Sequence, residues 1–266
     1  MTAVGADLSG RTAVVTGGTR GVGAGIADAF VRAGARVVVC ARRPPERPLP
    51  GCEFLPVDLR DATAVQDLFA RLDRVDVLVN NAGGTPYRLL GDSDAERHAR
   101  VIELNLTAPL TASLAAREQL AAAHGSIVMI GSVSGTRPSP GSAAYGAAKA
   151  GLENLARSMA VEWAPGIRVN TLVLGMVRTE LSALHYGDEA GIAAVGATVP
   201  LGRLAEPREI GAAAVFLASD AASYITGASL LLHGGGERPA FLDAATVNKN
   251  GRRERPTRTG GKGGVT

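Results

Sequence analysis

Residues 12–43 read TAVVTGGTRGVGAGIADAFVRAGARVVVCARR, and this stretch decides the fold. It begins with a short apolar, β-branched run at residues 12–16 and continues through a glycine-rich turn into a helical pattern over residues 25–33, which Gly34 closes. A second strand pattern follows at residues 36–40. Strand, glycine turn, helix and strand in this order predict a parallel β–α–β unit.

The same alternation continues along the chain. The connection at residues 41–52 departs from it, because its four prolines exclude a regular helix, and we expect an irregular crossover there. The chain is therefore predicted to be α/β: a single-domain, Rossmann-type, doubly wound parallel sheet of about seven strands with helices on both faces. The further strands are predicted at residues 53–57, 75–80, 126–130, 167–173 and 229–232, and the further helices at residues 62–72, about 93–122, 144–163 and 207–218.

Composition limits the function classes. Aromatic residues make up only 4% of the 266 residues, so the core must consist of Ala, Val, Leu and Ile. No apolar stretch approaches the roughly 18 residues that span a bilayer, and the first eight residues lack a signal-peptide pattern. We expect a cytoplasmic protein without membrane association. Cys40 and Cys52 are expected to be unpaired apolar fillers, since a reducing cytosol disfavours disulfides.

The charge is unevenly distributed. Residues 248–266 carry six basic side chains and one acidic one, so residues 1–247 have a net charge of −2 although the whole chain has +3. This tail is Gly-rich and almost without apolar residues, which predicts disorder. The slightly acidic body does not favour nucleic-acid binding; a weak contact of the tail with nucleic acid or a membrane surface is the alternative to a solvated extension.

The glycine-rich turn, residues 16–23 (TGGTRGVG), lies where backbone N–H groups and a helix N-terminus can receive a pyrophosphate. A Cβ would block that approach. Taken alone the turn could serve packing only, but its place in the first strand–turn–helix unit favours dinucleotide binding.

The spacing T-G-x-x-x-G-x-G resembles that of the short-chain dehydrogenase/reductase family. The similarity extends over residues 8–235 and includes five motifs in the family's order. They are the glycine turn, Asn80-Asn81-Ala82-Gly83, Asn105, Ser132, and Tyr145 with Lys149. The overall layout is similar to that of 3-oxoacyl-thioester reductases.

The resemblance implies that residues 1–247 form an NADP(H)-binding catalytic domain for a small-molecule carbonyl or alcohol substrate. It also implies a homo-oligomer, a tetramer or a dimer, assembled through the helices at residues 93–122 and 144–163.

The choice of nucleotide follows from charge at the end of the second strand. NAD-specific relatives carry an acidic residue there, and a carboxylate would repel a 2′-phosphate. This chain has Ala41 followed by Arg42, and Arg20 in the glycine turn adds a second cation that can pair with phosphate. NADP(H) is therefore the expected cofactor, and Arg43 is interpreted as a solvated charge.

Two of the expected cofactor contacts have alternative roles. Asp58 matches the position that binds adenine in the family, but it could instead cap the next helix. Asn81 could be purely structural. No metal site is expected. The cofactor-binding residues implied by the resemblance are Gly17, Thr19, Arg20, Gly21, Val22, Gly23, Arg42, Asp58, Leu59, Asn81, Ala82, Gly83, Tyr145, Lys149, Val177 and Thr179.

Tyr145 and Lys149 are four residues apart in a helical pattern, so their side chains share a face. A free phenol has a pKa near 10, and a neighbouring ammonium together with an oxidised nicotinamide would favour the phenolate. Tyr145 is the predicted general acid/base and Ser132 the residue that orients the substrate oxygen. By resemblance, Lys149 also holds the nicotinamide ribose, and Asn105 anchors a water that links Lys149 to solvent.

The segment after the sixth strand departs from the family pattern, with Leu174-Gly175 in place of Pro-Gly. Residues 180–200 then correspond to the family's substrate lid, in which His185 and Tyr186 either contact substrate or are ordinary surface and packing residues. The alternative to an enzyme is an NADP-binding sensor or scaffold without turnover, which the intact set of Ser132, Tyr145 and Lys149 argues against.

Overall fold

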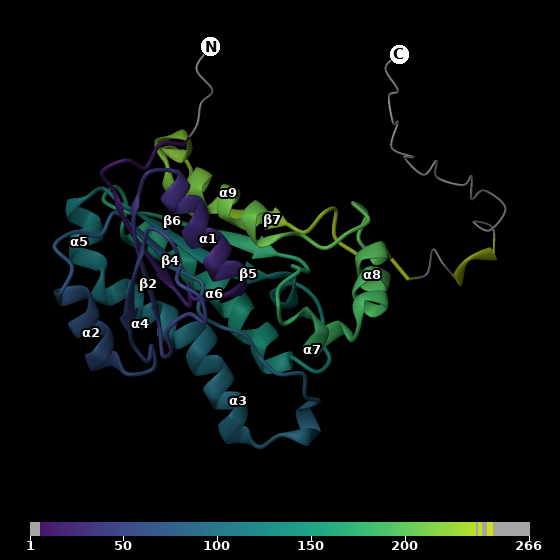
Figure 1. Ribbon diagram of the computed structural model, residues 1–266. Helices are drawn as coiled ribbons and strands as arrows, with labels where there is room; N and C mark the ends of the chain where they lie inside the picture. The colour runs from purple at the N-terminus through teal and green to yellow at the C-terminus, as the bar shows by residue number, and fades with distance from the viewer. Residues whose placement is uncertain (1–5, 238, 241–243, 247–266) are drawn as a thin grey trace, which may run out of the picture.

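A computed structural model describes residues 6–237, 239–240 and 244–246, so the predicted tail at residues 248–266 lies outside the described residues. Seven strands in the described part form one parallel sheet in the order β3-β2-β1-β4-β5-β6-β7 (Figure 1). The sequence predicted this doubly wound α/β fold, and the structure confirms it. The strands are β1 (Thr12–Thr16), β2 (Arg36–Ala41), β3 (Cys52–Pro56), β4 (Val77–Asn80), β5 (Ser126–Ser132), β6 (Arg168–Leu174) and β7 (Ser229–Leu232).

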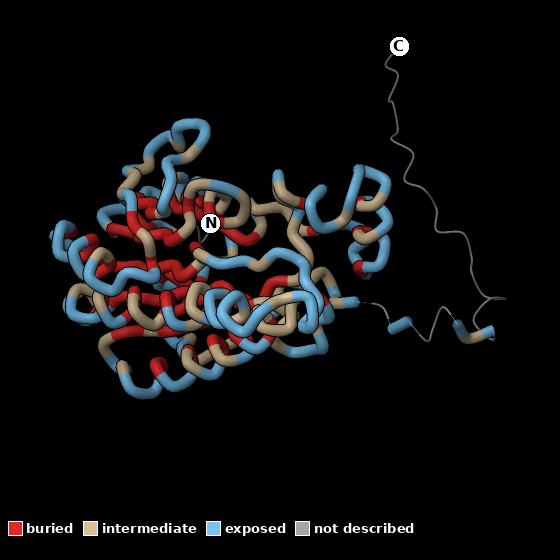
Figure 2. Tube along the Cα trace, turned by 90° about the horizontal axis from the view of Figure 1, so that it is seen from below, coloured by how far each residue is buried: buried red, intermediate tan, exposed pale blue. Residues whose placement is uncertain are grey.

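Helices cover both faces of the sheet. Helices α1 (Gly21–Arg32) and α9 (Pro207–Ala218) pack on one face; α2 (Ala62–Ala70), α4 (Ala108–Ala115) and α6 (Ala143–Glu162) pack on the other. Each face has its own aliphatic core, as the low aromatic content requires, and the buried residues follow the strands through the middle of the molecule (Figure 2). Short 3₁₀ turns lie at Leu90–Asp92, Val133–Gly135 and Asp220–Ala222.

The strand order reverses between β1 and β4, since β2 and β3 lie on one side of β1 and the later strands on the other. In open parallel sheets, ligands bind outside the carboxyl ends of the strands at this switch point. The glycine turn follows β1 directly, so the fold places it there. The crossover at residues 42–51 is irregular, as its prolines predicted, and both cysteines are free.

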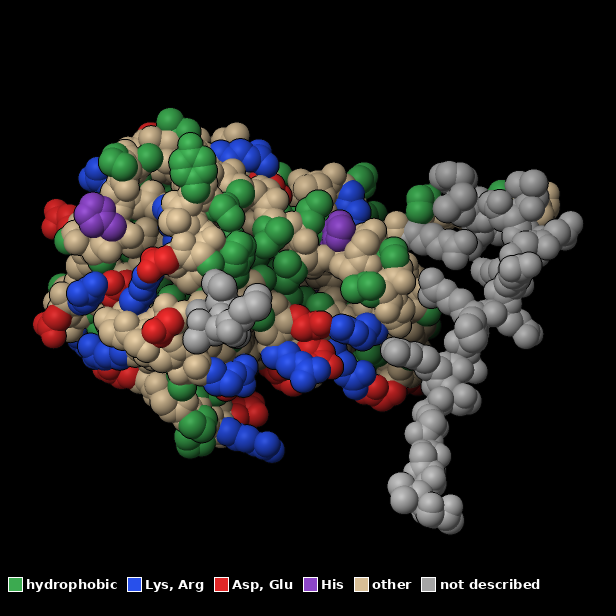
Figure 3. Space-filling model, turned by 90° about the horizontal axis from the view of Figure 1, so that it is seen from above, with side chains coloured by type: hydrophobic (Ala, Val, Ile, Leu, Met, Phe, Trp, Pro, Cys, Tyr) green, Lys and Arg blue, Asp and Glu red, His purple; other side chains and the backbone are tan. Residues whose placement is uncertain are grey.

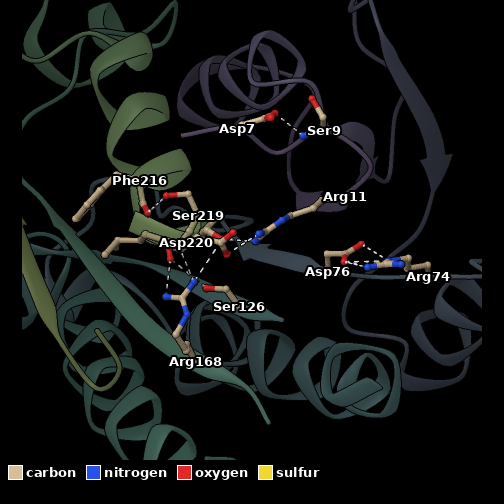
Figure 4. A network of polar contacts seen from close by, with 12 residues as sticks. Asp7, Ser9, Arg11, Arg74, Asp76, Ser126, Arg168, Phe216, Ser219 and Asp220 are labelled. Atoms are coloured by element: carbon tan, nitrogen blue, oxygen red, sulfur yellow. Dashed lines mark hydrogen bonds and ion pairs between the residues drawn. The ribbon is translucent and has the colours of Figure 1, made fainter. Parts of the chain in front are cut away.

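The amino edge of the sheet is closed by a polar network (Figure 4). Arg168, the first residue of β6, donates hydrogen bonds to the last carbonyls of α9, including that of Leu217 at 2.8 Å. Arg11 donates to the Ala218 carbonyl at 3.2 Å and pairs with Asp220. A helix C-terminus leaves several carbonyls without intrahelical partners, and these guanidinium groups supply the missing donors.

The predicted helix at residues 93–122 is wrong as a single element. The chain forms α3 (Ala95–Ile102), a π turn (Glu103–Thr107), α4 and α5 (Arg117–Ala122) instead. The π turn inserts an extra residue into the helical winding and turns Asn105 inward, where it is completely buried. Such turns occur frequently at functional sites.

The expected lid region contains two helices that its small, polar composition did not indicate, α7 (Ser182–Tyr186) and α8 (Glu189–Thr198). Both lie beyond the carboxyl ends of the strands (Figure 1). Arg178, just after β6, holds α8 in place through two hydrogen bonds to Glu189 at 2.9 and 2.8 Å. Among the helices described, none combines the length and apolar character needed to cross a membrane.

Candidate active site

The glycine turn is packed too closely for side chains at Gly17, Gly18 and Gly23. A Cβ on Gly17, which has φ +63°, would lie 2.8 Å from the Ala82 Cα. A Cβ on Gly23 would lie 2.3 Å from the Gly17 carbonyl oxygen. The turn therefore folds back on the start of α1. Arg20 is exposed and Gly21 and Val22 are partly exposed there, which leaves the helix N-terminus open to an anion such as a pyrophosphate.

Asn81 joins the glycine turn to the end of β4. Its Nδ2 donates to the carbonyls of Thr16 and Gly17 at 2.9 and 3.1 Å. In return, the Thr16 Oγ1 accepts hydrogen bonds from the backbone N–H groups of Asn81 and Ala82. The structural role that the sequence left open for Asn81 is therefore present, and it holds the residues expected to contact adenosine against the turn.

Arg20 and Arg42 lie at the two ends of the segments that flank this turn. Arg20 is the N-cap residue of α1, and Arg42 follows the last residue of β2. The two segments are neighbours because Gly17 N donates to the Cys40 carbonyl at 2.7 Å. Both side chains are exposed, and neither has an ion-pair partner among the described residues. Exposed, unpaired guanidinium groups at this position are free to bind an anion.

Asp58 does not cap the next helix, so that alternative is wrong. Asp61 caps α2 instead, with its carboxylate accepting from the backbone N–H groups of Thr63 and Ala64. Asp58 forms a bidentate ion pair with Arg60: the Arg60 Nε donates to Oδ1 at 3.0 Å and the Arg60 Nη2 donates to Oδ2 at 2.6 Å. This pair lowers the pKa of Asp58 to about 2. Adenine binding by Asp58 and Leu59 stays a prediction.

Ser132, Tyr145 and Lys149 come together at the carboxyl edge. Ser132 ends β5, and Tyr145 and Lys149 lie in the first two turns of α6. Lys149 is buried, its Nζ donates to the Ile130 carbonyl at 2.7 Å, and it lies 5.4 Å from the ring centroid of Tyr145. The helical spacing thus places the two side chains together, as predicted.

The protein alone does not favour the phenolate. Burial raises the pKa of Tyr145, and the Ser132 hydroxyl offsets this only in part. Burial also lowers the pKa of Lys149 to about 8, which still leaves the ammonium mostly charged at neutral pH. Tyr145 is consequently protonated at neutral pH in the protein alone, and this is the form that can donate a proton to a carbonyl oxygen.

Asn105 lies behind Lys149. Its Oδ1 accepts from the Gly84 N–H at 2.9 Å, and its Nδ2 donates to the carbonyls of Gly84 and Val101. A Cβ on Gly83 would lie 2.4 Å from the Asn105 Oδ1 and 3.6 Å from the Lys149 Nζ. Only a glycine therefore fits between the two side chains. The bound water expected at Asn105 stays a prediction.

The segment after β6 reaches the start of α1. Thr179 lies beside Gly21, where an added Cβ would come within 3.4 Å of the Thr179 Cγ2. Val177 forms an isolated bridge with Ala205. The Thr179 Oγ1 already accepts weakly from Leu181 N at 3.3 Å, and the contacts expected for Thr19, Val22, Val177 and Thr179 with the cofactor stay predictions.

Sequence reasoning missed two charged residues near this edge, Arg137 and Glu237, which form an ion pair. They are separated by 100 residues, and no local pattern could have indicated the contact. Of the two lid residues that it named, Tyr186 is half-buried, whereas His185 is exposed. No group of three or more His, Cys, Asp or Glu in the described residues could hold a metal ion.

Comparison with known proteins gives consistent matches over most of the chain. A family model described as enoyl-(acyl carrier protein) reductase matches residues 17–237. L-fucose dehydrogenase of Oryctolagus cuniculus is 37% identical over 250 residues, which cover 88% of each chain. The 3-oxoacyl-[acyl-carrier-protein] reductase FabG of Escherichia coli is 38% identical and covers 86% of this chain and 98% of its own. Among solved structures, the RhlG/NADP active-site complex of Pseudomonas aeruginosa has a TM-score of 0.80, with 30% identity over 87% of this chain and 98% of that one.

Proposed function

This chain belongs to the short-chain dehydrogenase/reductase family, whose oxidoreductases bind a nicotinamide dinucleotide, and from this premise we propose that it transfers a hydride between NADP(H) and a carbonyl or secondary alcohol. One observation carries the proposal. A buried lysine ammonium lies beside a tyrosine ring at the same sheet edge as an accessible glycine turn. Proton transfer needs an acid beside a cation that can stabilise its conjugate base, whereas nucleotide binding alone does not need the tyrosine hydroxyl there.

Each of the three side chains has a task in this reaction. NADPH, when bound, supplies the hydride that reduces the carbonyl carbon, and NADP⁺ accepts it in the reverse direction. The Tyr145 hydroxyl donates its proton to the substrate oxygen during reduction and removes it during oxidation. The Ser132 hydroxyl donates a hydrogen bond to the same oxygen and fixes its position.

Lys149 has a further role at the site. One of its three N–H groups is engaged by the Ile130 carbonyl, which leaves two donors for the nicotinamide ribose. With an oxidised nicotinamide nearby, its charge also favours the phenolate of Tyr145. Asn105, buried behind it, would anchor the water through which protons reach solvent.

The residues around the glycine turn fit a phosphorylated dinucleotide. The turn approaches too closely for a Cβ at Gly17 and Gly23, so a pyrophosphate could contact the backbone N–H groups. Arg20 and Arg42 would bind the 2′-phosphate, which distinguishes NADP from NAD. The relative with known structure named above carries NADP, in agreement with this assignment. We assign the remaining contacts to Gly21, Val22, Thr19, Asp58, Leu59, Asn81, Ala82, Gly83, Val177 and Thr179.

We further propose that the protein is a homo-oligomer, a dimer or a tetramer. Leu114 on α4 and Val161 on α6 are exposed. Phe216 on α9 and Leu231 on the edge strand β7 are exposed as well. The face seen from above in Figure 3 also shows hydrophobic side chains gathered near its centre, with charged ones around them. Exposed apolar clusters of this kind mark protein interfaces, and light scattering of the full chain tests the assembly.

The direct test is the oxidation of NADPH, followed by its absorbance, with NADH in parallel and a panel of ketones, β-keto thioesters, quinones and sugars. We expect turnover with NADPH at least tenfold faster than with NADH, since the loss of one good phosphate–Arg contact costs about 1.4 kcal/mol or more. Arg42→Glu should invert this preference. Equal use of both nucleotides would overturn the NADP assignment, and binding of NADPH without any turnover would favour a sensor.

A further inference from the structure

The segment after β4, residues 83–88, lies along the start of α6 and contacts it at both ends. At one end, a Cβ on Gly83 would lie 3.6 Å from the Lys149 Nζ. At the other end, the Arg88 N–H donates to the Gly141 carbonyl at 2.7 Å. Gly141 lies two residues before the first residue of α6. The segment therefore spans the first two turns of this helix.

Tyr145 lies midway between these two contacts, four residues after Gly141 and four before Lys149. Tyr145 and Lys149 share one face of α6, and a helical side chain leans toward the N-terminus of its helix. The Tyr145 ring therefore leans toward the turn that contains Gly141, on the face where Gly83 lies beside Lys149. Because Tyr145 is partly exposed, the segment borders an open approach to the reacting hydroxyl.

The Tyr87 ring packs on Gly141 at the end of this segment. A Cβ on Gly141 would lie 2.0 Å from the ring Cε2 and 2.4 Å from the ring Cδ2, so the ring occupies the space that any other side chain would need. Gly141 has φ +79° and is buried, whereas Tyr87 is 67% exposed. One side of the ring is therefore packed against backbone, and the rest of it is open to a ligand.

The residues that follow Tyr87 make this border of the site apolar. Leu89 and Leu90 are 48% and 63% exposed, and exposed apolar clusters mark binding sites. Their aliphatic side chains can pack against any apolar surface. An aromatic ring is more selective, because two aromatic rings in offset-stacked or edge-to-face contact gain more than their buried area alone provides. A ring that is already held by backbone also loses little freedom on binding.

We propose that Tyr87 is a specificity-determining residue whose ring packs against an aromatic ring attached to the reacting carbonyl or carbinol carbon, so that the substrate is an aryl ketone or an aryl carbinol. Gly141 and Tyr145 are separated by one helical turn, about 5.4 Å, so a substituent on the reacting carbon can reach Tyr87. The identity of the reacting centre rests on the proposed function. The contact with Tyr87 is a binding property, and it can be measured without turnover.

The test compares ketones with the same carbon skeleton that differ only in an aromatic or a saturated ring. Acetophenone with cyclohexyl methyl ketone, and propiophenone with cyclohexyl ethyl ketone, are titrated calorimetrically into the full chain, with and without saturating NADP⁺, which cannot reduce them. We expect each aryl ketone to bind about two- to tenfold more tightly than its saturated partner. A site that recognised apolar area alone would favour the saturated ring, because that ring carries more C–H surface.

Three variants assign the preference to the Tyr87 ring. Tyr87→Leu keeps an apolar side chain but removes the ring, so the preference for the aryl ketone should disappear or reverse. Tyr87→Phe keeps the ring and should retain the wild-type preference. Tyr224→Leu is the matched control, because it removes another exposed tyrosine ring, between α9 and β7, and should leave the preference unchanged.

The proposal is overturned if the wild type binds the saturated ketone at least as tightly as the aryl ketone, if it binds neither, or if Tyr87→Leu keeps the wild-type preference. The absorbance of NADPH in the presence of the same ketones tests the proposed function separately. Selective binding without NADPH oxidation would count against the proposed function and leave the Tyr87 contact intact. Oxidation of NADPH without selective binding of the aryl ketone would do the reverse.

Discussion

The two edges of the parallel sheet consist of the same strands, but their polar groups are used in opposite ways. At the amino edge, Arg168 and Arg11 are engaged with the carbonyls that end α9 (Figure 4). At the carboxyl edge, Arg20 and Arg42 have no ion-pair partner in the described part of the chain, and Lys149 is buried with a single hydrogen bond. The amino edge therefore stabilises the fold, whereas the carboxyl edge keeps donors available for ligands.

The largest expected effect is on turnover, from Tyr145→Phe at the carboxyl edge. Removal of the hydroxyl deletes the proton donor, and general acid/base groups contribute about 10²–10⁴-fold. We expect kcat with NADPH to fall in that range while the melting temperature stays unchanged. Tyr224→Phe, on a fully exposed side chain, is the control. Full activity of Tyr145→Phe would refute the assigned mechanism.

The next effect is on stability, from Arg168→Met at the amino edge. The substitution removes the Arg168 donors from the final carbonyls of α9 and leaves Ala218 with Arg11 alone, and hydrogen bonds to charged groups contribute about 1.5–3 kcal/mol. We expect the free energy of unfolding, measured in urea, to fall by about 3 kcal/mol, with kcat at low temperature unchanged. Arg36→Met is the control, because Arg36 also begins a strand but forms only an exposed ion pair with Glu53. A loss of activity without a loss of stability would contradict the division between the two edges.

A third expectation concerns the cost of keeping Lys149 charged in the interior. Burial lowers its pKa from 10.5 to about 8, so the folded protein releases this proton before the unfolded chain does. The free energy of unfolding therefore increases as the pH rises from about 8 to 10.5, because Lys149 loses its charge in the folded protein first. Below pH 8 the lysine is charged in both states, and the buried charge destabilises the folded protein. We expect Lys149→Met to abolish activity. It should nevertheless raise the free energy of unfolding at pH 7 by about 2 kcal/mol, a net value in which the lost hydrogen bond to Ile130 offsets part of the gain from removing the buried charge.

The measurement is urea unfolding of both proteins at pH 7 and pH 10. The difference between Lys149→Met and the wild type should shrink at the higher pH. A constant difference would show that packing, and not the charge, accounts for it.

Much of the carboxyl edge could be predicted from sequence because its signals are local. The glycine turn, the Tyr145–Lys149 spacing and the alternating strands each depend on residues within a few positions of one another, and the structure brings them together as expected. The amino-edge network could not be predicted. Arg168 contacts carbonyls about fifty residues away, and an arginine at the start of a strand has no pattern that indicates such a partner.

Two local features also escaped prediction for physical reasons. A π turn adds one residue to a helical winding without any change in composition, so the inward turn of Asn105 was not visible. Asp58 and Asp61 both precede α2, and only the backbone geometry decides that the second one is the cap. The contact of Arg60 with Asp58 was within reach, because the two residues are separated by only one position.

The smallest expected effect concerns Asp58 and Arg60, the ion pair at the part of the carboxyl edge where we expect adenine to bind. Arg60 lowers the pKa of Asp58 to about 2, so the pair stabilises the fold above the unfolded value of about 3.8, and this contribution is lost as the pH falls through 2. Because the Asp58 side chain is 37% exposed, solvent screens the pair, and we expect Arg60→Ala to cost less than about 1 kcal/mol at pH 7.

The same variant separates stability from cofactor binding at this position. The small difference in unfolding free energy should shrink as the pH falls toward 2, where Asp58 is about half protonated. Any change in the affinity for NADPH, measured by fluorescence titration, should come from the loss of the Arg60 contact with Asp58. Asp61→Ala serves as the contrasting variant, since it removes a helix cap without touching the expected adenine contact. If Arg60→Ala destabilised the protein by several kcal/mol, Asp58 would belong with the structural network of the amino edge and not with the ligand-binding edge.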